Sequence, residues 1–340
     1  MDLGVGELYF VREIDPETKK YTKFVKIGLV HEKEGRDSLH RLSEHQTGNP
    51  RTLILPPDNY FSSPAINRVE AMMHKVFARN RVSGEWFEFE TEREVLSAIK
   101  KAKALSAEVV AQIPTFAKAI KLGQSEDNGK TIKATAVAQE LIEVIAVSRA
   151  KSSSLSEISD LISSKLKSAM TDGVNVQGAA TEVKVNRKGK FLLDLLKQED
   201  PKTYRKYLVT SLSLSARFTP KVSKLSLEDL EPSFQKLVEQ LHSRVNNAGK
   251  KDFQALNEVQ LIITDEIASA EWDEEFAVAE LKIACGRNEA IQGICTWKRK
   301  PVEKETFDEK SFKLENPKKY EKYLEQPTTT TYLKVAKRKV

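Results

Sequence analysis

The stretches ELYFVREI at residues 7–14 and YTKFVKIGLV at residues 21–30 decide the fold of the N-terminal part. Both are rich in β-branched and aromatic residues, and the turn-forming segment DPETKK separates them, so the pattern predicts a β-hairpin. Further elements follow: a helix at 38–46, a strand at 51–55, a helix after Ser62-Ser63-Pro64, a strand at 85–89 and a helix opened by a Thr91/Glu94 capping box. We therefore expect an α+β domain over residues 1–105.

The character of the sequence changes after residue 105 to long helical patterns, interrupted by the polar stretch GQSEDNG at 123–129. We interpret residues 106–130 as a linker or helix. Residues 131–220 and 221–340 are then predicted to be two helical repeats, the second with a basic tail.

An internal repeat supports this division. Residues 191–208 (FLLDLLKQEDPKTYRKYL) align without gaps to residues 307–324 (FDEKSFKLENPKKYEKYL), with nine identities in eighteen positions. Each unit is predicted to contain a long helix, a short β-hairpin (at 179–185 and 291–298), a helical segment interrupted by proline, and a closing strand. Further helices at 132–147 and 227–245 precede the units, so two helical hairpins are expected to pack as a bundle or as a coiled coil.

Composition bounds the function only loosely. The chain has 340 residues, of which 40% are hydrophobic, and its 55 Lys and Arg exceed its 49 Asp and Glu by a net +6, which permits a nucleic-acid partner without demanding one. Two cysteines far from any histidine pair indicate neither a zinc site nor a disulfide scaffold. Without a signal peptide or an apolar run long enough to cross a bilayer, the expectation is a cytoplasmic protein with no membrane partner.

Five ordered segments resemble the GIY-YIG nuclease superfamily, in particular a phage-associated branch of it. They cover roughly the first ninety residues: Glu7-Leu8-Tyr9, Lys26-Ile27-Gly28, Arg41 to His45 continuing through Pro50, Val69-Glu70 with Met73-His74, and Gly84-Glu85-Trp86-Phe87. Several segments in the right order are far more specific than one short motif.

The resemblance implies hydrolysis of a phosphodiester with one bound Mg²⁺ or Mn²⁺, held by Glu70 and completed by water and phosphate oxygens. It implies that Tyr9 is the general base and that Arg41 holds the phosphate. His45, one helical turn after Arg41, is expected to face the same site. Taken alone, a tyrosine on a strand is more often a core residue and Glu70 with His74 a solvated helical pair.

The sequence departs from the family pattern at two places. Lys26 stands where the second motif usually has tyrosine, and its ammonium could lower the pKa of Tyr9 or contact phosphate. The family's asparagine has no clear counterpart, and the Gly-Glu-Trp-Phe element takes its place. Gly28, His74 and Glu85 are predicted to support the site, with His74 orienting Glu70, serving in packing or contacting the metal.

The second repeat resembles the tail that follows the catalytic domain of YqaJ-type phage recombination exonucleases, which implies a DNA context linked to phages or mobile elements. Its cluster Trp297, Lys298, Arg299 and Lys300 combines basic and aromatic residues, which can track a phosphate backbone and stack bases. We name these four as candidate nucleic-acid contacts, although most such clusters are solvated surface.

These observations favour a divalent-metal-dependent endonuclease acting on DNA in phage defence, phage recombination or mobile-element biology. Two alternatives stay open. One is a DNA-binding or scaffold protein that keeps the fold with weak or no turnover. The other is a nuclease whose repeats hold it inactive until a protein partner binds. The repeats are also expected to position DNA or to mediate self-association.

Overall fold

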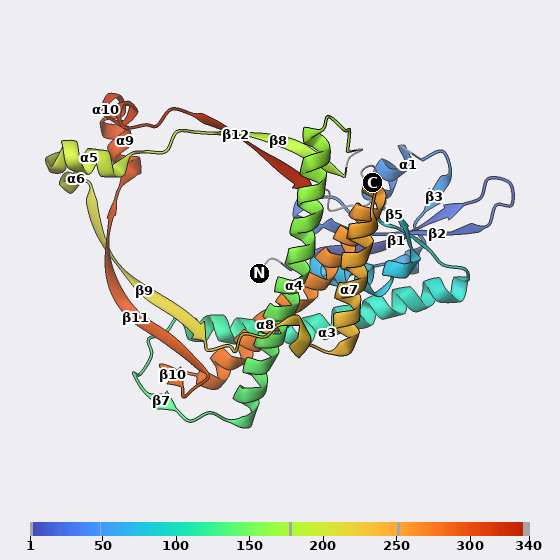
Figure 1. The fold of residues 1–340 in the computed structure, drawn as a ribbon, viewed down its shortest axis with the longest axis horizontal. Helices are drawn as coiled ribbons and strands as arrows, with labels where there is room; N and C mark the ends of the chain where they lie inside the picture. Colours follow the sequence, from blue (N-terminus) through green and yellow to red (C-terminus); the bar gives the residue numbers. More distant parts are fainter. Residues whose placement is uncertain (1–2, 48, 177–178, 250–251, 336–340) are drawn as a thin grey trace.

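The computed structural model describes residues 3–47, 49–176, 179–249 and 252–335, which form an N-terminal α+β part and a C-terminal part of long helices and paired strands (Figure 1). This confirms the predicted α+β class. None of the helices in these residues combines the length and the apolar character that a membrane span requires. Gly48 of the motif region and the basic residues Lys337, Arg338 and Lys339 lie outside the described residues.

The N-terminal sheet is antiparallel and has the order β3-β1-β2-β6-β5, with β4 also paired to β1. Its first two strands form the predicted hairpin, and the Asp15 carboxylate closes the turn by accepting the backbone N–H groups of Glu17 and Thr18. The strands are β1 (Gly6–Ile14), β2 (Tyr21–His31), β3 (Thr52–Ile54), β4 (Tyr60–Ser63), β5 (Arg81–Ser83) and β6 (Trp86–Glu88).

Three helices accompany this sheet: α1 (Ser38–Thr47), α2 (Ile66–Val76) and α3 (Glu92–Gly123). Apolar side chains from β1, β2, α2 and α3, among them Leu8, Ile27 and Met73, form the core between them. The Thr91/Glu94 capping box opens α3 as predicted. Short 3-10 turns lie at η1 (Glu32–Glu34), η2 (Pro57–Asn59), η3 (Ala78–Asn80) and, later in the chain, η4 (Leu227–Asp229).

Helix α3 does not end where the predicted domain boundary lies. It continues through residues 105 and 106 as one helix to Gly123, because its apolar face finds new partners beyond the sheet. Val109 packs with Ala65 and with Trp272 of the C-terminal part. The polar stretch after Gly123 is a loop, as predicted.

The C-terminal part is centred on α4 (Ala136–Thr171), α7 (Pro232–Asn247) and α8 (Phe253–Cys285), which pack around a shared apolar core. Two expectations were wrong here. The first pair of helices is one continuous helix, α4, because Ala150 and Leu155 bury its middle and leave no break. Residues 131–132 form strand β7 (Thr131–Ile132), paired in parallel with β10 (Ala290–Ile291), and not the start of a helix.

The repeated units share the order strand, helix, helix, strand. In the first these elements are β8 (Ala180–Arg187), α5 (Leu193–Glu199), α6 (Pro201–Lys206) and β9 (Leu208–Pro220). In the second they are β11 (Cys295–Phe307), α9 (Glu309–Glu315), α10 (Pro317–Lys322) and β12 (Thr328–Val335). Each strand pairs with the other unit: β8 with β12, and β9 with β11.

This exchange corrects one of the two predicted hairpins. Residues 291–298 do form one, between β10 and β11. Residues 179–185 do not, because β8 takes its hydrogen-bonding partner from the end of the second unit. The β8/β12 pair is a separate two-stranded sheet, whereas β9 and β11 form the long end of a four-stranded sheet of order β7-β10-β11-β9. The two pairs, which we call ribbons, have the same register. Arg187 pairs with Thr328, and the equivalent residues 116 positions away, Glu303 and Leu212, pair with each other.

The identities between the repeats lie in the helical tip, where α5, α6, α9 and α10 meet at the far end of both ribbons (Figure 1). Phe191 stacks on Tyr320 with ring centroids 4.8 Å apart, and Tyr204 stacks on Phe307 at 5.7 Å. Aromatic contacts of this kind stabilise beyond the area they bury. The repeat therefore encodes a small aromatic core to which both copies contribute.

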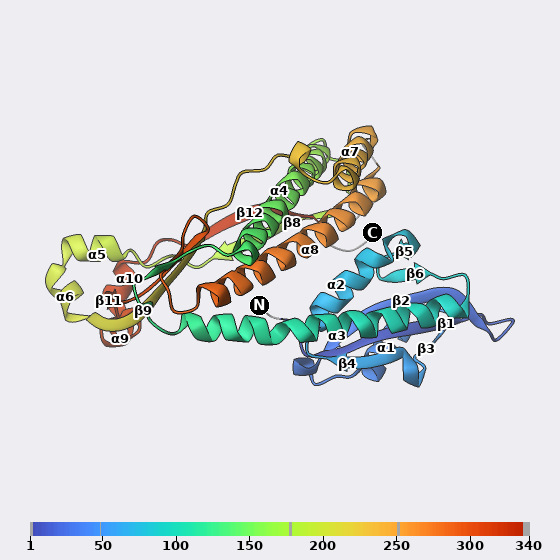
Figure 2. The ribbon, with the colours of Figure 1, turned by 90° about the horizontal axis from the view of Figure 1, so that it is seen from below.

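Helix α8 joins the two parts of the chain, lying against α2 and α3 (Figure 2). The guanidinium of Arg68 on α2 donates to the Ala268 carbonyl oxygen at 2.8 Å, and Lys75 pairs with Glu266 at 2.8 Å. Trp272 donates its indole N–H to Gln112 of α3 at 2.8 Å. The helix that carries Glu70 is thus braced by the C-terminal part.

Candidate active site

Tyr9 lies at the centre of the candidate site, on β1 and almost fully buried. Its phenol is 2.9 Å from Nε2 of His45, and the Arg41 side chain, which pairs with Glu44, lies near it. Burial raises the pKa of Tyr9 and the negative charge of Glu85 raises it further, whereas Arg41 opposes the shift. The phenol therefore carries its proton at neutral pH.

His45 contacts the phenol through its Nε2 ring nitrogen. Burial, with the nearby charges of Lys26 and Arg41, lowers its pKa to about 4. The imidazole is consequently neutral at pH 7, and its Nε2 can accept the phenolic O–H. Helix α1 places His45 and Arg41 one turn apart on the side that faces β1.

Gly28 makes room for the phenol. It is paired directly with Tyr9 across β1 and β2, and a Cβ at this position would lie 2.6 Å from the phenolic oxygen. No side chain fits there without moving Tyr9. The close approach of the Tyr9 ring therefore explains why this chain has a glycine at this position of the second motif.

Lys26 contacts Glu85 rather than standing free in the site. The two form an ion pair, with the side chains 10% and 17% exposed. Glu85 precedes β6, and its backbone carbonyl accepts the N–H of Ile27 at 2.9 Å. The lysine therefore offsets the carboxylate that raises the pKa of Tyr9.

Glu70 and His74 lie on α2 but face different surroundings. The negative charge of Glu70 raises the pKa of Tyr9 and acts on Arg81, so its carboxylate lies within electrostatic range of both. His74 lies 3.4 Å from the Ile27 carbonyl oxygen and against the Phe87 ring, and burial lowers its pKa to about 4. These contacts favour the packing role of His74.

The candidate donor for a divalent metal in this site is the Glu70 carboxylate. No group of three or more His, Cys, Asp or Glu side chains in the described ranges could hold a metal ion, so a cage made of protein ligands alone has no candidate there. Glu70 supplies one carboxylate, and Glu85 is occupied by Lys26. Mg²⁺ and Mn²⁺ accept a single carboxylate and retain water for the remaining positions.

Arg81 was missed by sequence reasoning. Its side chain lies under the site, over the Phe87 ring and within the electrostatic reach of Glu70 and Glu85. Asp265 of α8 approaches it at 3.8 Å, and burial raises the pKa of Asp265 to about 6. Nothing in the sequence near Arg81 points to this pair, because its partner is supplied by a helix from the C-terminal part.

The buried histidine His74 makes stability depend on pH. Because its pKa of about 4 is below the ordinary 6.5, the unfolded chain binds more protons between these values, and stability falls as pH drops through this window. The free energy of unfolding is measured with urea at both ends of this pH window. We expect His74→Gln to reduce the difference between the two values by about 2 kcal/mol. His40→Gln, an exposed position, should leave it unchanged; parallel behaviour of both variants would contradict the assignment.

Two of the four predicted nucleic-acid contacts were wrong. Trp297 is 2% exposed and Arg299 is 0% exposed, so neither can reach a nucleic acid. The guanidinium of Arg299 lies 3.8 Å over the Trp297 ring and donates to the carbonyl oxygens of Leu122, Gly286 and Asn288. Lys298 and Lys300 are exposed and lie 3.7 and 3.8 Å from Glu289.

Arg299 is therefore expected to be a structural residue. Arg299→Met removes the donors of three carbonyl oxygens in a buried place, and we expect it to lower the free energy of unfolding by about 3 kcal/mol. Urea denaturation followed by tryptophan fluorescence measures this, since Trp297 lies beneath the guanidinium. Lys300→Met at an exposed position is the control, and an equal loss in both variants would refute the structural role.

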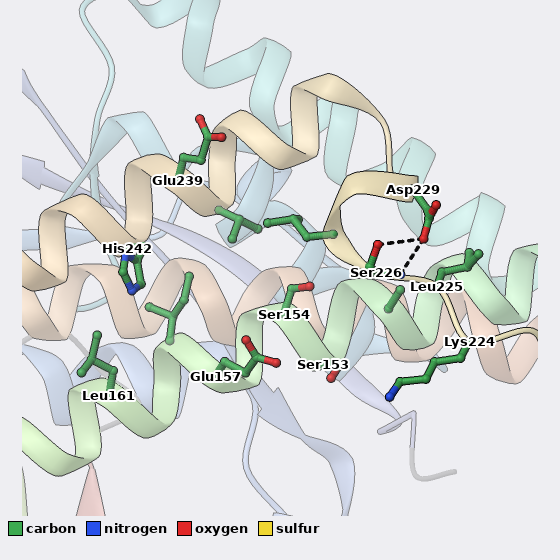
Figure 3. A pocket seen from close by; sticks show the side chains of 14 residues that line it. Ser153, Ser154, Glu157, Leu161, Lys224, Leu225, Ser226, Asp229, Glu239 and His242 are labelled. Carbon is green, nitrogen blue, oxygen red and sulfur yellow. Dashed lines mark hydrogen bonds between the residues drawn. The ribbon is translucent and has the colours of Figure 1, made fainter.

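A pocket of about 970 Å³ lies elsewhere, between α4 and α7 (Figure 3). Its lining includes Ser153, Ser154 and Glu157 of α4 and Glu239 and His242 of α7, and Asp229 accepts hydrogen bonds from Ser226 at its edge. None of the predicted catalytic residues lines this pocket.

The antiparallel sheet and the group formed by Tyr9, His45 and Arg41 lie within the segment that the family comparison matches. Residues 7–103 match the T5orf172 domain, a phage-associated domain related to GIY-YIG and HNH-like nucleases. No curated protein and no solved structure matches the chain. The resemblance of the second repeat to YqaJ-type exonuclease tails stays a prediction.

Proposed function

We propose that this protein is a divalent-metal-dependent endonuclease that hydrolyses phosphodiester bonds in DNA, in a phage-linked setting such as defence, recombination or mobile-element biology. The observation that carries the proposal is the grouping of Tyr9, His45 and Arg41 against Gly28, with the Glu70 carboxylate within electrostatic range of Tyr9. The match of residues 7–103 to the T5orf172 domain supports the phage-linked, nuclease-like part.

The proposed chemistry uses the tyrosine as a proton relay. Tyr9 takes a proton from the attacking water as it passes its own proton to the neutral Nε2 of His45, so that no free phenolate has to form in a buried place. Hydroxide then attacks phosphorus, the bond to the leaving oxygen breaks, and that oxygen takes a proton from solvent water while His45 releases its proton to solvent. A Mg²⁺ or Mn²⁺ ion held by Glu70 would polarise the phosphate and lower the pKa of the water.

Arg41 and Lys26 have different proposed tasks. Arg41 is partly exposed, pairs with Glu44 and acts on the Tyr9 phenol, and its proposed task is to hold a phosphate oxygen. Lys26 neutralises the charge of Glu85, and this reduces the electrostatic repulsion of an anionic substrate.

The rival function is DNA binding without turnover. Its supporting observation is the raised pKa of Tyr9, which makes the phenol a poor base if His45 does not accept its proton. A scaffold of this kind would keep the fold and the exposed positive charge while lacking cleavage.

The decisive experiment incubates purified full-length protein with supercoiled plasmid and with single-stranded DNA, in Mg²⁺, in Mn²⁺ and in EDTA. We expect nicking or linearisation with either metal and none in EDTA. Binding with a steep salt dependence but no cleavage of either substrate would refute the enzyme and favour the rival.

A further inference from the structure

The ribbon formed by β9 and β11 has two chemically different faces. Residues that pair directly across an antiparallel ribbon lie on the same face, so the register sorts them. One face, which we call the cation face, consists of Val209, Ser211, Ser213, Ser215, Arg217 and Thr219 of β9 with Thr296, Lys298, Lys300, Val302, Lys304 and Thr306 of β11. It combines four cations with hydroxyl groups and has no carboxylate.

The opposite face of this ribbon holds its carboxylates and most of its large apolar residues. Glu303 and Glu305 lie there, together with Leu212, Trp297 and Phe307. The separation means that the positive charge of the cation face is not neutralised within its own ribbon. Lys298 and Lys300 share one acidic neighbour, Glu289, at 3.7 and 3.8 Å.

The cation face is open to solvent along most of its length. All of its residues are exposed except Thr296, which is half-buried. Arg217 and Lys304 form no ion pair with any residue in the described part of the chain. No layer of helix or sheet therefore covers this face.

The fold does not require these cations, as the second ribbon demonstrates. By the shift of 116, Lys298 corresponds to Glu182, and Arg217 corresponds to Leu333, and these two residues pair in the β8/β12 ribbon. In the β9/β11 ribbon the same position brings Arg217 directly opposite Lys298, two like charges whose contact costs stability. A ligand of opposite charge would offset this cost.

The distribution of charge along the chain also favours an anionic ligand for the ribbons. Residues 180–220 and 295–335, the ribbons and the tip, contain 19 Lys and Arg against 11 Asp and Glu, an excess of +8, whereas the whole chain carries +6. The remainder is therefore slightly acidic, at −2. The positive charge is concentrated in the part of the protein that projects away from the N-terminal sheet (Figures 1 and 2).

We infer that the cation face binds the phosphate backbone of double-stranded DNA and anchors the substrate away from the cleavage site. Lysine and arginine with serine and threonine hydroxyls are the side chains that contact phosphates without reading sequence. The 13 residues of each strand span roughly 40 Å, about one turn of B-DNA, and a two-stranded ribbon fits its groove. The inference rests on the proposed function only for the choice of DNA as ligand.

The test measures binding without catalysis. Full-length Glu70→Gln protein in EDTA is titrated into a fluorescein-labelled duplex of about 30 base pairs, roughly three turns, at several salt concentrations, by fluorescence anisotropy. To this background we add R217Q/K298Q/K304Q on the cation face. The control adds K184Q/K188Q/K334Q at the β8/β12 ribbon, which removes the same charge. Circular dichroism melting verifies that both are folded.

We expect the cation-face variant to lose affinity by about tenfold or more, and the slope of log K against log salt to become shallower by about 0.9 for each cation removed. The control variant should retain most of the affinity and most of the salt dependence. Equal losses in the two variants would show a response to net charge only and would overturn the inference. If the cation-face variant binds the duplex as tightly as its Glu70→Gln parent, the inference is also overturned, even if the self-association of the variant has changed.

The outcome is separable from that of the proposed function. Because binding is measured in EDTA on a Glu70→Gln background, an inactive wild type leaves the inference standing if the cation face binds duplex. Conversely, a metal-dependent nuclease whose cation-face variant binds normally loses only this inference.

Discussion

Glu70→Gln is expected to reduce metal-dependent cleavage by at least about a thousandfold, which corresponds to several kcal/mol of transition-state stabilisation. The substitution keeps the size and hydrogen-bonding capacity of the side chain and removes the negative charge that would hold the cation. In the described ranges no cluster of alternative ligands stands ready to replace it. Multiple-turnover cleavage of plasmid in Mg²⁺ and in Mn²⁺ measures the effect.

The matched control is Glu108→Gln, an exposed glutamate on α3 that lies outside the site. It should cleave at the wild-type rate. Since Glu70 also interacts with its surroundings through Tyr9 and Arg81, thermal melting must show that the Glu70→Gln variant is folded. A folded Glu70→Gln variant with wild-type cleavage would exclude Glu70 as the metal ligand.

The N-terminal elements could be predicted because their signals are local. The hairpin follows from two apolar strands around a Pro-containing turn, and the start of α3 follows from Thr91 and Glu94, three residues apart. The site residues lie on these elements, so their grouping follows once the hairpin and α1 are placed. The roles of Tyr9, Arg41 and Glu70 rest on the resemblance and stay proposals.

The errors share a physical origin in long-range pairing. The 179–185 hairpin was wrong because the partner of β8 is β12, far along the chain. Trp297 and Arg299 were assigned to the surface because a basic and aromatic cluster looks exposed in sequence. Their strand alternates, however, so that Trp297 and Arg299 point into the protein while Lys298 and Lys300 point out.

The end of helix α3 is a second example of a feature that long-range contacts determine. A helical pattern indicates that a helix exists, but its end depends on what its apolar face meets. Val109 is buried only because Trp272 arrives from α8. A boundary placed at residue 105 therefore cuts a continuous helix, and truncation there would expose this cluster as well as remove the repeats.

Gly28→Ala is expected to reduce cleavage by about a hundredfold, because displacing a reacting group by about 1 Å costs that much. The new methyl group would lie 2.6 Å from the phenolic oxygen of Tyr9 and 2.7 Å from its Cζ, so the ring has to move away from His45. Gly123→Ala is the matched control, since its Cβ would meet Trp297 at an ordinary 3.6 Å. Plasmid cleavage rates and thermal melting measure both variants.

A double-mutant cycle identifies the cause of the Gly28→Ala loss. Tyr9→Phe removes the hydroxyl that the new methyl group would strike and, with it, the proposed proton relay to His45. If Gly28→Ala acts by displacing that hydroxyl, it should cost little more in the Tyr9→Phe background, and the two losses should be strongly non-additive. Additive losses would instead mean that the glycine matters for the strand itself, because a general distortion of β2 would harm cleavage whether or not residue 9 carries a hydroxyl.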